Sequence, residues 1–553
     1  MQFSEFPSSK PVVQIPNWAL ILLFLAYALP GNIGHVPWRG DDVLHISVAY
    51  AMLQEGHWLS PTLAGAAYTD WGPLTYWLGA ASGKLLGGLL TVHDAIRLSM
   101  ALAVGVVAVS LRSAARVFYG REVASAVVLL SLGSLGLLVH AHEMQPQIVL
   151  LACMSLNFLG IARLGERPAL GAIISGAAAG AGFLTAGLIG LMLTLPLLLL
   201  APWLHAEPRR PASARPLLPG LAPLALLVCG WLGALYFVAP DYLSAWLNHQ
   251  LARALPHAGH FQQFKSLGNL IGWFTWPLWP VALWSLWHRR SRYVSFGHAI
   301  PIASLVLALW FVTTTGPLRP ANALPLLPPL ILIAAAELCR LRRGASNAFD
   351  WFGVLTFSLL GIFLWLAWTG LNLGWPSGLA RNVLRVMPGF SPSWLWLELA
   401  VAIALSVAWL VAIIKVPFFQ LRGAVHWALG VILMWGLATT LWLSWFDYDK
   451  NYQRVSAQIV QAIRAENLPP EACIAGKETG DAQRAGLYYF DGLKLQMTAS
   501  AEAACPLLLA YASGRRELPP VSTTRELVWQ TERGRGRLRE QFALYRKADA
   551  AAP

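Results

Sequence analysis

Long apolar runs recur along almost the whole chain, and they constrain its fold more than any other feature. Most are close to the twenty or so residues that an α-helix needs to cross a bilayer. They number about thirteen and lie at about residues 18–30, 94–111, 123–139, 147–162, 168–184, 186–203, 217–238, 268–287, 297–315, 322–338, 350–372, 396–414 and 425–445. Helices satisfy their own backbone inside lipid, and runs of this length favour them. The sequence therefore predicts an all-α polytopic membrane domain with about 13 transmembrane helices over residues 1–445.

The charges are few and unevenly placed. The chain has 553 residues, of which 56% are hydrophobic and 12% charged, and its net charge is +13. Basic residues gather in every second short loop between the apolar runs, for example at 289–292 and 340–343. Such loops stay on the cytoplasmic side of a membrane, so the positive charge indicates topology and not nucleic-acid binding. We expect a multi-pass membrane protein with a cytoplasmic N-terminus and a C-terminal domain on the outer side of the membrane.

The first outer loop, residues 31–93, is too long and too patterned to be a simple connector. Apolar residues recur at helical spacing over 43–54, between polar positions. This pattern predicts an amphipathic helix that lies along the membrane surface. A second segment, 73–90, contains four glycines and is expected to form another surface helix or a short re-entrant one.

The last hundred residues change character and predict a small soluble α/β domain over 446–553. We expect a helix over 452–465 and strands in GLYYFDGLKLQM (486–497) and LLLAYAS (507–513), with Asp491-Gly492 as a turn signal. Cys473 and Cys505 both fall in this domain, and an oxidising outer compartment favours a disulfide between them. Two unpaired thiols remain the alternative, because the sequence does not supply the geometry.

Adjacent carboxylates, Asp41 and Asp42, follow the first apolar run closely. One interpretation is local: Asp42 caps the helix predicted from residue 43, and both side chains are solvated. The same outer face also supplies Asp70 and Glu143 beside apolar segments, where charges are costly unless they serve a cavity or a partner. Acids converging from different loops would suit acid–base chemistry on a polar headgroup. All four are therefore candidate catalytic residues.

The segment from Asp41 to Ala80 resembles the first outer loop of the integral-membrane glycosyltransferases with the GT-C fold. It is most similar to the aminoarabinose transferases that modify lipid A (glycosyltransferase family 83) and to the protein O-mannosyltransferases (family 39). The residues that carry the resemblance are Asp41-Asp42, Met52, Gly56-His57-Trp58, Pro61, Tyr68, Asp70, Pro73 and Tyr76-Trp77. The number of spans, the topology and the outer C-terminal domain extend the resemblance to most of the chain.

By this resemblance the chain is expected to be an inverting glycosyltransferase that uses a polyprenyl-phosphate-linked sugar, such as an undecaprenyl-phosphate sugar. It would act at the periplasmic face of the bacterial inner membrane, with its C-terminal domain in the periplasm. Its acceptor is lipid A, another glycolipid or glycan, or a protein, and membrane lipids surround it. Asp41 matches the acid that the family uses as catalytic base or to position the acceptor. Glu143 is similar in position to the family's second acid, between the third and fourth spans, and Gln145 occupies the alternative alignment.

Two departures from the family pattern concern the donor phosphate. Leu44 and His45 stand where the family has Arg-Tyr, and Trp71 stands where it has a phosphate-binding Lys. Arg and Lys are the natural phosphate ligands, so other basic residues are needed, although each could instead be a surface Arg near lipid headgroups. The candidate substrate-binding residues are Arg39, His45, Tyr68, Trp71, His142, Arg253 and Arg319.

Two alternatives to a metal-free enzyme stay open: a protein that does not catalyse sugar transfer, and a site that holds a metal ion. The chain could be a non-catalytic relative, or a transport or flippase-type protein that handles polyprenyl-linked glycans. A transporter typically carries mid-span charges and interrupted helices in paired repeats, and the sequence shows few of either. No cofactor is certain and no metal motif such as His-Glu-x-x-His occurs, but a weakly held divalent cation at Asp41, Asp70 and Glu143 is another option.

Overall fold

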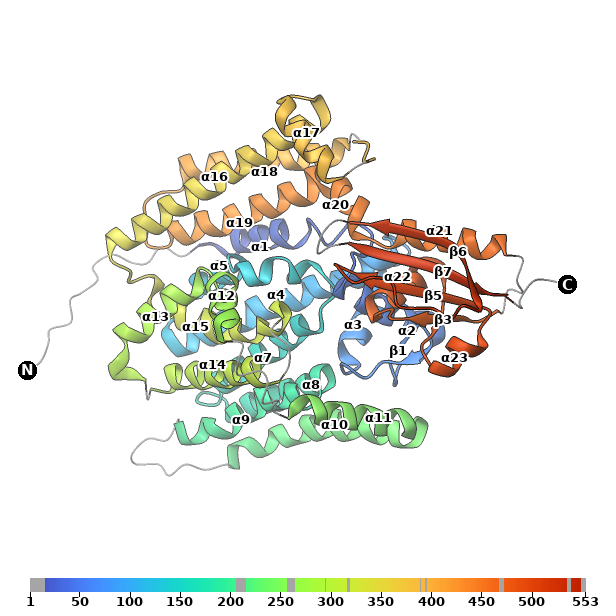
Figure 1. Cartoon of the computed structure of the whole chain (residues 1–553). Helices are drawn as coiled ribbons and strands as arrows, with labels where there is room; N and C mark the ends of the chain where they lie inside the picture. Colours follow the sequence, from blue (N-terminus) through green and yellow to red (C-terminus); the bar gives the residue numbers. More distant parts are fainter. Residues whose placement is uncertain are drawn as a thin grey trace, which may run out of the picture.

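Helices make up most of the molecule, and a small sheet domain lies at one end of them (Figure 1). The computed structural model describes residues 15–204, 215–255, 264–293, 295–315, 319–387, 389–392, 395–466, 472–534 and 539–548. In Figure 1 the sheet, drawn in red, stands beside the end of the bundle where α2 and α3 lie. The predicted combination of a polytopic helical part with a small α/β part is confirmed.

Within the described ranges, nine helical segments are long and apolar enough to cross a membrane. They are α4 (Val92–Tyr119), α7 (Pro146–Arg163), α8 (Pro168–Ala186), η3 with α10 (Arg215–Val238), α14 (Phe296–Thr314), η6 with α15 (Pro320–Leu338), α16 (Arg343–Leu373), α18 (Trp396–Lys415) and α19 (Arg422–Leu441). A tenth is the pair Arg121–Leu132 and Leu135–His142, which is bent by 59°. The chain is thus a multi-pass membrane protein.

The remaining predicted spans coincide with shorter apolar helices. They are α1 (Asn17–Ala28), α9 (Leu188–Leu204) and the pair α12 (Phe264–Phe274) and α13 (Leu278–His288). Two further helices, α11 (Pro240–Ala254) and α17 (Ser377–Val386), follow spans α10 and α16. Each of the thirteen predicted runs therefore lies on a helix or on a pair of helices.

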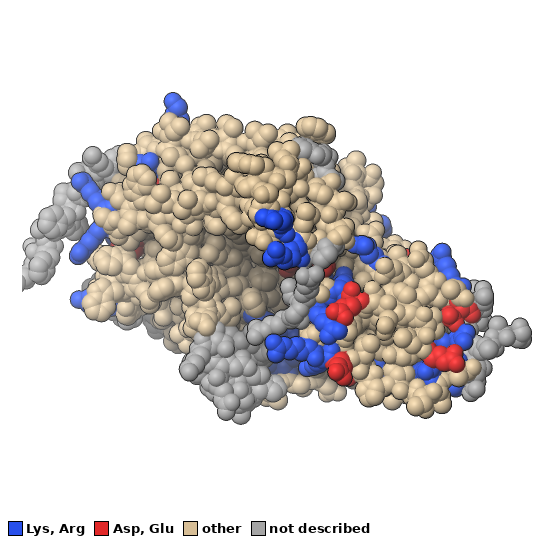
Figure 2. All heavy atoms as spheres, turned by 45° about the horizontal axis from the view of Figure 1, so that its top comes forward, with Lys and Arg blue, Asp and Glu red and all other residues tan. Residues whose placement is uncertain are grey.

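The outside of the bundle is suited to lipid. Helices α10 and α18 leave most of their apolar side chains exposed, whereas α15 is almost entirely buried among its neighbours. Figure 2 shows a broad face of the bundle that is nearly free of charge, with Lys, Arg, Asp and Glu gathered toward its ends and over the C-terminal domain. An apolar band between charged ends is what a membrane-spanning surface requires.

The 31–93 loop departs from its prediction. It contains α2 (Asp41–Glu55), the short strands β1 (Thr62–Leu63) and β2 (Ala66–Ala67), and α3 (Leu74–Leu86). The predicted helix over 43–54 is present as α2, but it is not an exposed amphipathic helix: it is buried between α3, α4 and helix α22 (Asp481–Asp491) of the C-terminal domain. The Ser47 hydroxyl donates to the backbone carbonyl of Ala485 at 2.7 Å, and Val43 joins the core of the C-terminal domain. Three of the polar positions that suggested a solvated face, Asp42, His45 and Ser47, are instead paired inside the protein, while Gln54 near the end of the helix is exposed.

The C-terminal domain is a five-stranded mixed sheet with helices. Its elements are α20 (Leu443–Lys450), α21 (Gln453–Ala465), β3 (Ile474–Lys477), α22 (Asp481–Asp491), β4 (Leu495–Gln496), α23 (Ala499–Ala504), β5 (Leu507–Ser513), β6 (Arg525–Arg533) and β7 (Glu540–Lys547). The strand order is β4-β3-β5-β7-β6, parallel among β4, β3 and β5 and antiparallel from β5 through β7 to β6. Ile474 pairs with Leu507, and Ala510 with Ala543.

Three predictions for this domain are confirmed and one is wrong. The helix over 452–465 and the strand over 507–513 are present, and Cys473 and Cys505 form a disulfide with their Cα atoms 5.2 Å apart. The segment GLYYFD, predicted as a strand, belongs to α22, which buries Leu487 and Tyr488 on one face. Gly492 has φ of +70° and ends this helix as its C-cap, so the supposed hairpin signal is a helix stop.

Candidate active site

A cavity of about 430 Å³ lies where the 31–93 loop meets the bundle. It is formed by the first turns of α2, the segment 68–71 before α3, helix α11 and the chain between α14 and η6. Seven of the eleven residues predicted to catalyse or bind substrate line it. They are Asp41, His45, Tyr68, Asp70, Trp71, Arg253 and Arg319. We call it the acidic pocket, after Asp41 and Asp70.

Asp41 is the first residue of α2 and faces this pocket. The side-chain amide of Gln145 donates to Asp41 Oδ2 at 3.3 Å and to Glu143 Oε2 at 3.2 Å. Glu143 does not line the pocket, but this shared amide connects it to Asp41. Gln145 is fully buried and its own Oε1 has no partner in the described part of the chain. A single amide thus fixes one oxygen of each carboxylate and leaves the other oxygens of both for further contacts.

Asp70 lies next to two groups that carry or can carry positive charge. His249 Nε2 is 3.4 Å from Asp70 Oδ1, and its Nδ1 is 3.2 Å from the backbone carbonyl of Thr69. The Arg253 guanidinium donates to the backbone carbonyl of Asp70 and stacks over the Trp71 ring, 4.8 Å from its centroid. Trp71, which replaces the family's Lys, therefore provides a surface that holds an Arg from another helix.

The inner wall of the pocket is neutral and aromatic. His45 is buried, and its Nδ1 lies 2.9 Å from the Tyr76 hydroxyl. Burial lowers the pKa of His45 to about 4, although Asp41 and Asp70 oppose the shift, so this ring is uncharged at neutral pH. Burial likewise raises the pKa of Tyr68 well above its usual range, which keeps its phenol protonated. His45 therefore cannot supply the charge of the Arg that the family carries nearby.

Asp42 is a correction to the predicted catalytic set. It is 1% exposed and points into the protein, where Arg97 donates to its two oxygens at 3.3 and 3.0 Å. The backbone amides of Trp38 and Met144 donate to the same carboxylate. Burial opposes ionisation, but the Arg97 guanidinium outweighs it and holds the pKa of Asp42 below its usual value. With every lone pair directed at a protein donor, Asp42 joins three chain segments and does not reach the pocket.

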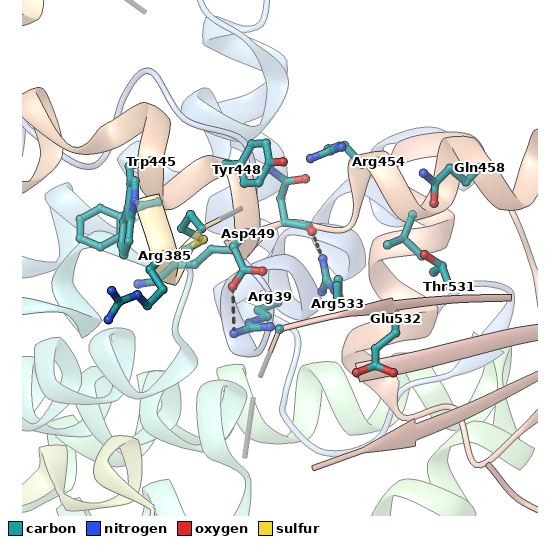
Figure 3. Close-up of a pocket in the computed structure, with 16 residues that line it drawn as sticks. Arg39, Arg385, Trp445, Tyr448, Asp449, Arg454, Gln458, Thr531, Glu532 and Arg533 are labelled. Carbon is teal, nitrogen blue, oxygen red and sulfur yellow. Dashed lines mark hydrogen bonds and ion pairs between the residues drawn. The ribbon is translucent and has the colours of Figure 1, made fainter. Parts of the chain in front are cut away.

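His142 and Arg39 are also placed outside the acidic pocket. His142 is buried between Tyr27 and Trp435, and its ring nitrogens face the carbonyls of Leu138 and Tyr27 at 2.5 and 2.7 Å. Nothing of this ring is left for substrate. Arg39 lines a different cavity, shown in Figure 3, where it pairs with Asp449 at 3.6 Å.

Several pocket residues were missed by sequence reasoning. They are Gln147, His249, Thr315 and Asn322. His249 stands four residues before Arg253 in α11, and side chains at that spacing share one helix face, so this signal was available. Gln147 is buried with Oε1 unpartnered in the described ranges, but nothing in its sequence context marks it.

The divalent-cation option gains no support from the geometry. Among the described residues, no three His, Cys, Asp or Glu side chains come together in a group that could hold a metal ion. Asp41 and Asp70 share the pocket, while Glu143 does not line it. The three carboxylates therefore do not form the cation site that the sequence allowed.

Comparison with known proteins supports the expected resemblance. Residues 70–238 match the family described as dolichyl-phosphate-mannose-protein mannosyltransferase. The chain is 26% identical over 373 residues to the undecaprenyl phosphate-α-4-amino-4-deoxy-L-arabinose arabinosyl transferase of Aeromonas salmonicida, covering 63% of this chain and 66% of the relative. A relative of the same name from Pseudomonas fluorescens is 25% identical over 259 residues, 45% of this chain and 44% of its own length. The chain thus spans about two thirds of the length of the first relative and less than half of the second.

Solved structures extend the likeness to the whole fold. The crystal structure of ArnT from Cupriavidus metallidurans in the apo state superposes with a TM-score of 0.66 at 17% identity, covering 97% of this chain and 99% of that one. The same protein bound to undecaprenyl phosphate gives 0.67 at 18% identity, covering 97% and 100%. At this identity the likeness establishes the fold, which is the GT-C fold together with a C-terminal sheet domain.

Proposed function

We propose that this chain, which resembles the aminoarabinose transferases in sequence and fold, is a lipid-linked-sugar-dependent glycosyltransferase. Its donor is a sugar on a polyprenyl phosphate, of which undecaprenyl phosphate is the form bound in the solved relative. The acceptor is a lipid, glycan or protein at the outer face of the bacterial inner membrane. This placement puts the N-terminus in the cytoplasm and the C-terminal domain in the periplasm.

One observation carries the proposal: the acids and cations of one cavity come from parts of the chain far apart in sequence. Asp41 and Asp70 from the 31–93 loop face the same space as Arg253 from α11 and Arg319 from the chain before η6. A transferase of this type needs a group that orients or deprotonates the acceptor and positive charge for the leaving phosphate. A pocket of two acids and two arginines offers both.

The arrangement suggests a division of roles. The acceptor oxygen attacks the anomeric carbon from the side opposite the phosphate, and its proton passes to Asp41. The bond between that carbon and the phosphate oxygen breaks, and polyprenyl phosphate leaves with the electron pair, which inverts the anomeric centre. Arg253 and Arg319 bind the phosphate, because guanidinium is a natural partner for its oxygens. Asp70 and His249 flank the sugar or the acceptor.

Gln145 and Glu143 hold Asp41 in place. An amide that donates to both carboxylates fixes the direction of Asp41, so its outward oxygen faces the pocket. Orientation of a catalytic group within a few tenths of an ångström matters for rate. Glu143 is therefore a positioning residue in this proposal.

A donor panel tests the function. Purified full-length protein is incubated with a set of labelled polyprenyl-phosphate sugars and a mixed acceptor fraction, and release of polyprenyl phosphate is followed with time. Turnover of one donor, with the product anomer inverted relative to that donor, is the expected result. The absence of turnover with every donor would contradict the proposal and favour a binding role.

A further inference from the structure

A second and larger cavity, of about 880 Å³, lies where the bundle meets the C-terminal domain (Figure 3). Its walls come from α17, α20, the first turns of α21, strand β6 and the segment before α2. We call it the basic cavity, because five basic side chains line it against two acidic ones, Asp449 and Glu532. Figure 3 shows Arg39, Arg385, Arg454 and Arg533 on different elements around this space, with Asp449 facing Arg39.

Three of its cations are not used by the fold as ion pairs. Arg39 and Arg533 both contact Glu540, a carboxylate that links the 31–93 loop to the sheet. By contrast, Arg385, Lys450 and Arg454 have no carboxylate within 4 Å in the described part of the chain. Unpaired cations on a concave surface focus a positive potential into it.

Aromatic rings hold two of these cations. Lys450 Nζ lies 4.7 Å from the ring centroids of both Trp38 and Phe446, and the Arg454 guanidinium lies 4.6 Å from that of Tyr448. Cation–π contacts fix the positions of these charges without neutralising them. The first turn of α21 adds to the positive potential, because a helix dipole places partial positive charge at its N-terminus.

The rest of the wall is apolar and continues toward lipid. Met387, Trp445 and Phe446 line the cavity beside the cations. Close by in the chain, Trp396 and Leu397 at the start of α18 are more than 70% exposed, as expected for side chains at a membrane boundary. The cavity thus combines a polar, positive part with an apolar part at the edge of the membrane-spanning bundle.

From this combination we propose that the basic cavity is a binding site for the phosphate headgroup of an anionic membrane lipid. Arg385, Lys450 and Arg454 contact the phosphate oxygens, and Met387, Trp445 and Phe446 contact the lipid's apolar stem. The site is separate from the acidic pocket: Arg39 lines one and Asp41 lines the other, and no residue lines both. Binding at this site does not depend on sugar transfer.

The test measures lipid binding by the full-length protein in the absence of any sugar donor. Protein in zwitterionic nanodiscs is titrated with phosphatidylglycerol carrying a photoreactive acyl chain, and the labelled peptides are identified by mass spectrometry. Phosphatidylcholine with the same acyl chain is the neutral comparison, and inorganic phosphate is added as competitor in a separate arm. We expect phosphatidylglycerol to label α17 and α20 peptides at least about tenfold more than phosphatidylcholine.

Matched variants assign the effect to the cavity. The double variant Arg385→Gln with Arg454→Gln should lower the labelling about tenfold, while Arg381→Gln, an exposed Arg on α17 that does not line the cavity, should leave it unchanged. Arg454→Lys keeps the charge and should retain most of the labelling. Because all three positions are exposed, thermal unfolding should match that of the wild type.

Three results would overturn the proposal. The first is equal labelling by both lipids, and the second is equal labelling of the wild type and the double variant. The third is saturation of the basic cavity by inorganic phosphate at concentrations where the lipid does not label. If the double variant fails to fold, Arg385→Gln alone is tested together with the salt dependence of wild-type labelling. Labelling that does not fall with increasing salt would then reject a charge-based site.

Discussion

The acidic pocket and the basic cavity share the short segment that begins α2 but use it in opposite ways. Arg39 enters the basic cavity and Asp41 enters the acidic pocket. In the acidic pocket, the acids remain accessible and are flanked by Arg253 and His249. In the basic cavity, three cations have no acidic partner within ion-pair distance in the described chain. Charges that the fold leaves unpaired indicate where ligands of opposite charge bind. The acidic pocket and the basic cavity therefore indicate different ligands.

Asp42, the next residue after Asp41, has the residue type of a site acid but the environment of a structural one. Its pairing with Arg97 is fully buried, whereas Asp41 one residue earlier is only partly buried. The sequence motif alone cannot separate these two roles. The burial and the hydrogen-bond partners of each carboxylate distinguish the two roles.

The largest expected effect is on folding, from Asp42→Asn. Removing one partner of a buried ion pair leaves Arg97 with Asp94 as its remaining carboxylate partner among the described residues. The change should lower the free energy of unfolding by about 3 kcal/mol, the lower end of the usual cost. Thermal unfolding of detergent-purified protein, followed by size-exclusion chromatography, measures this. Asp41→Asn is the matched control and should unfold like the wild type. Equal stability of the two variants would contradict the structural role of Asp42 as opposed to Asp41.

Asp41→Asn should instead remove activity. Loss of a general base typically costs about 10²–10⁴-fold in rate, and the amide of Asn cannot take the acceptor proton. The rate of polyprenyl-phosphate release from the donor identified in the panel is the measurement. Asp241→Asn, an exposed acid at the start of α11 outside both cavities, serves as control. A fully active Asp41→Asn variant would mean that the acidic pocket is not the transfer site.

Removal of the Cys473–Cys505 disulfide should act on one cavity more than on the other. The bond closes a loop of 32 residues in the C-terminal domain, and its loss should destabilise that domain by about 3 kcal/mol. Strand β6 of this domain lines the basic cavity, while the acidic pocket has no lining residue from it among those described. Lipid labelling and donor turnover of Cys473→Ala with Cys505→Ala are therefore compared. A greater loss of donor turnover than of lipid labelling would contradict the separation of the basic cavity from the acidic pocket.

Arg253→Gln tests the positive side of the acidic pocket. Loss of one charged donor to the phosphate should raise the KM for the donor about tenfold, with a smaller change in kcat. Steady-state kinetics with the purified donor measures both constants. Lys84→Gln, an exposed basic residue on α3, is the control and should change neither. An unchanged KM would indicate that the donor phosphate does not bind at α11.

The smallest expected effect concerns Asp447, beside the basic cavity. Burial raises the pKa of this carboxyl to about 6, and the Trp38 indole donates to it at 2.7 Å. The unfolded chain has a value near 4, so between about pH 4 and 6 the folded state binds the proton more tightly and stability falls as the pH rises.

The variant Asp447→Asn should abolish this fall. The difference in free energy of unfolding between the variant and the wild type should shift by about 1–2 kcal/mol in favour of the variant between pH 4.5 and pH 7.5. This range follows from the pKa shift, reduced for solvent screening. Melting temperatures of both proteins at the two pH values measure the difference. Asp491→Asn, at the exposed end of α22, should behave like the wild type. A constant difference at both pH values would show that Asp447 titrates normally.

Most of the architecture was predictable because it depends on local pattern. Apolar runs of the length of a bilayer must form helices wherever they occur, so each predicted span met a helix. The prediction of a strand for GLYYFD was wrong for a tertiary reason: a run of aromatic residues suits a strand, but packing of α22 against α2 and α21 selected the helix. Neighbours distant in the chain override weak β propensity.

The candidate site was predictable in part. Asp41, Asp70, Arg253 and Arg319 were expected from loop position and family pattern, and they line one pocket. Arg39 and His142 were expected on the same grounds and lie elsewhere. Whether a loop residue reaches a cavity depends on which other segment comes beside it, and no spacing within the loop records that.

The sequence by itself determined that this chain is a polytopic helical membrane protein with an acidic first loop and a sheet-containing end, because hydrophobic length and periodicity act residue by residue. The tertiary structure alone decided which of two adjacent carboxylates faces substrate space and which is held by Arg97. Successive residues on a helix point about 100° apart, so Asp41 and Asp42 meet different surroundings. Those surroundings are built by residues about fifty to a hundred positions away, brought together by packing.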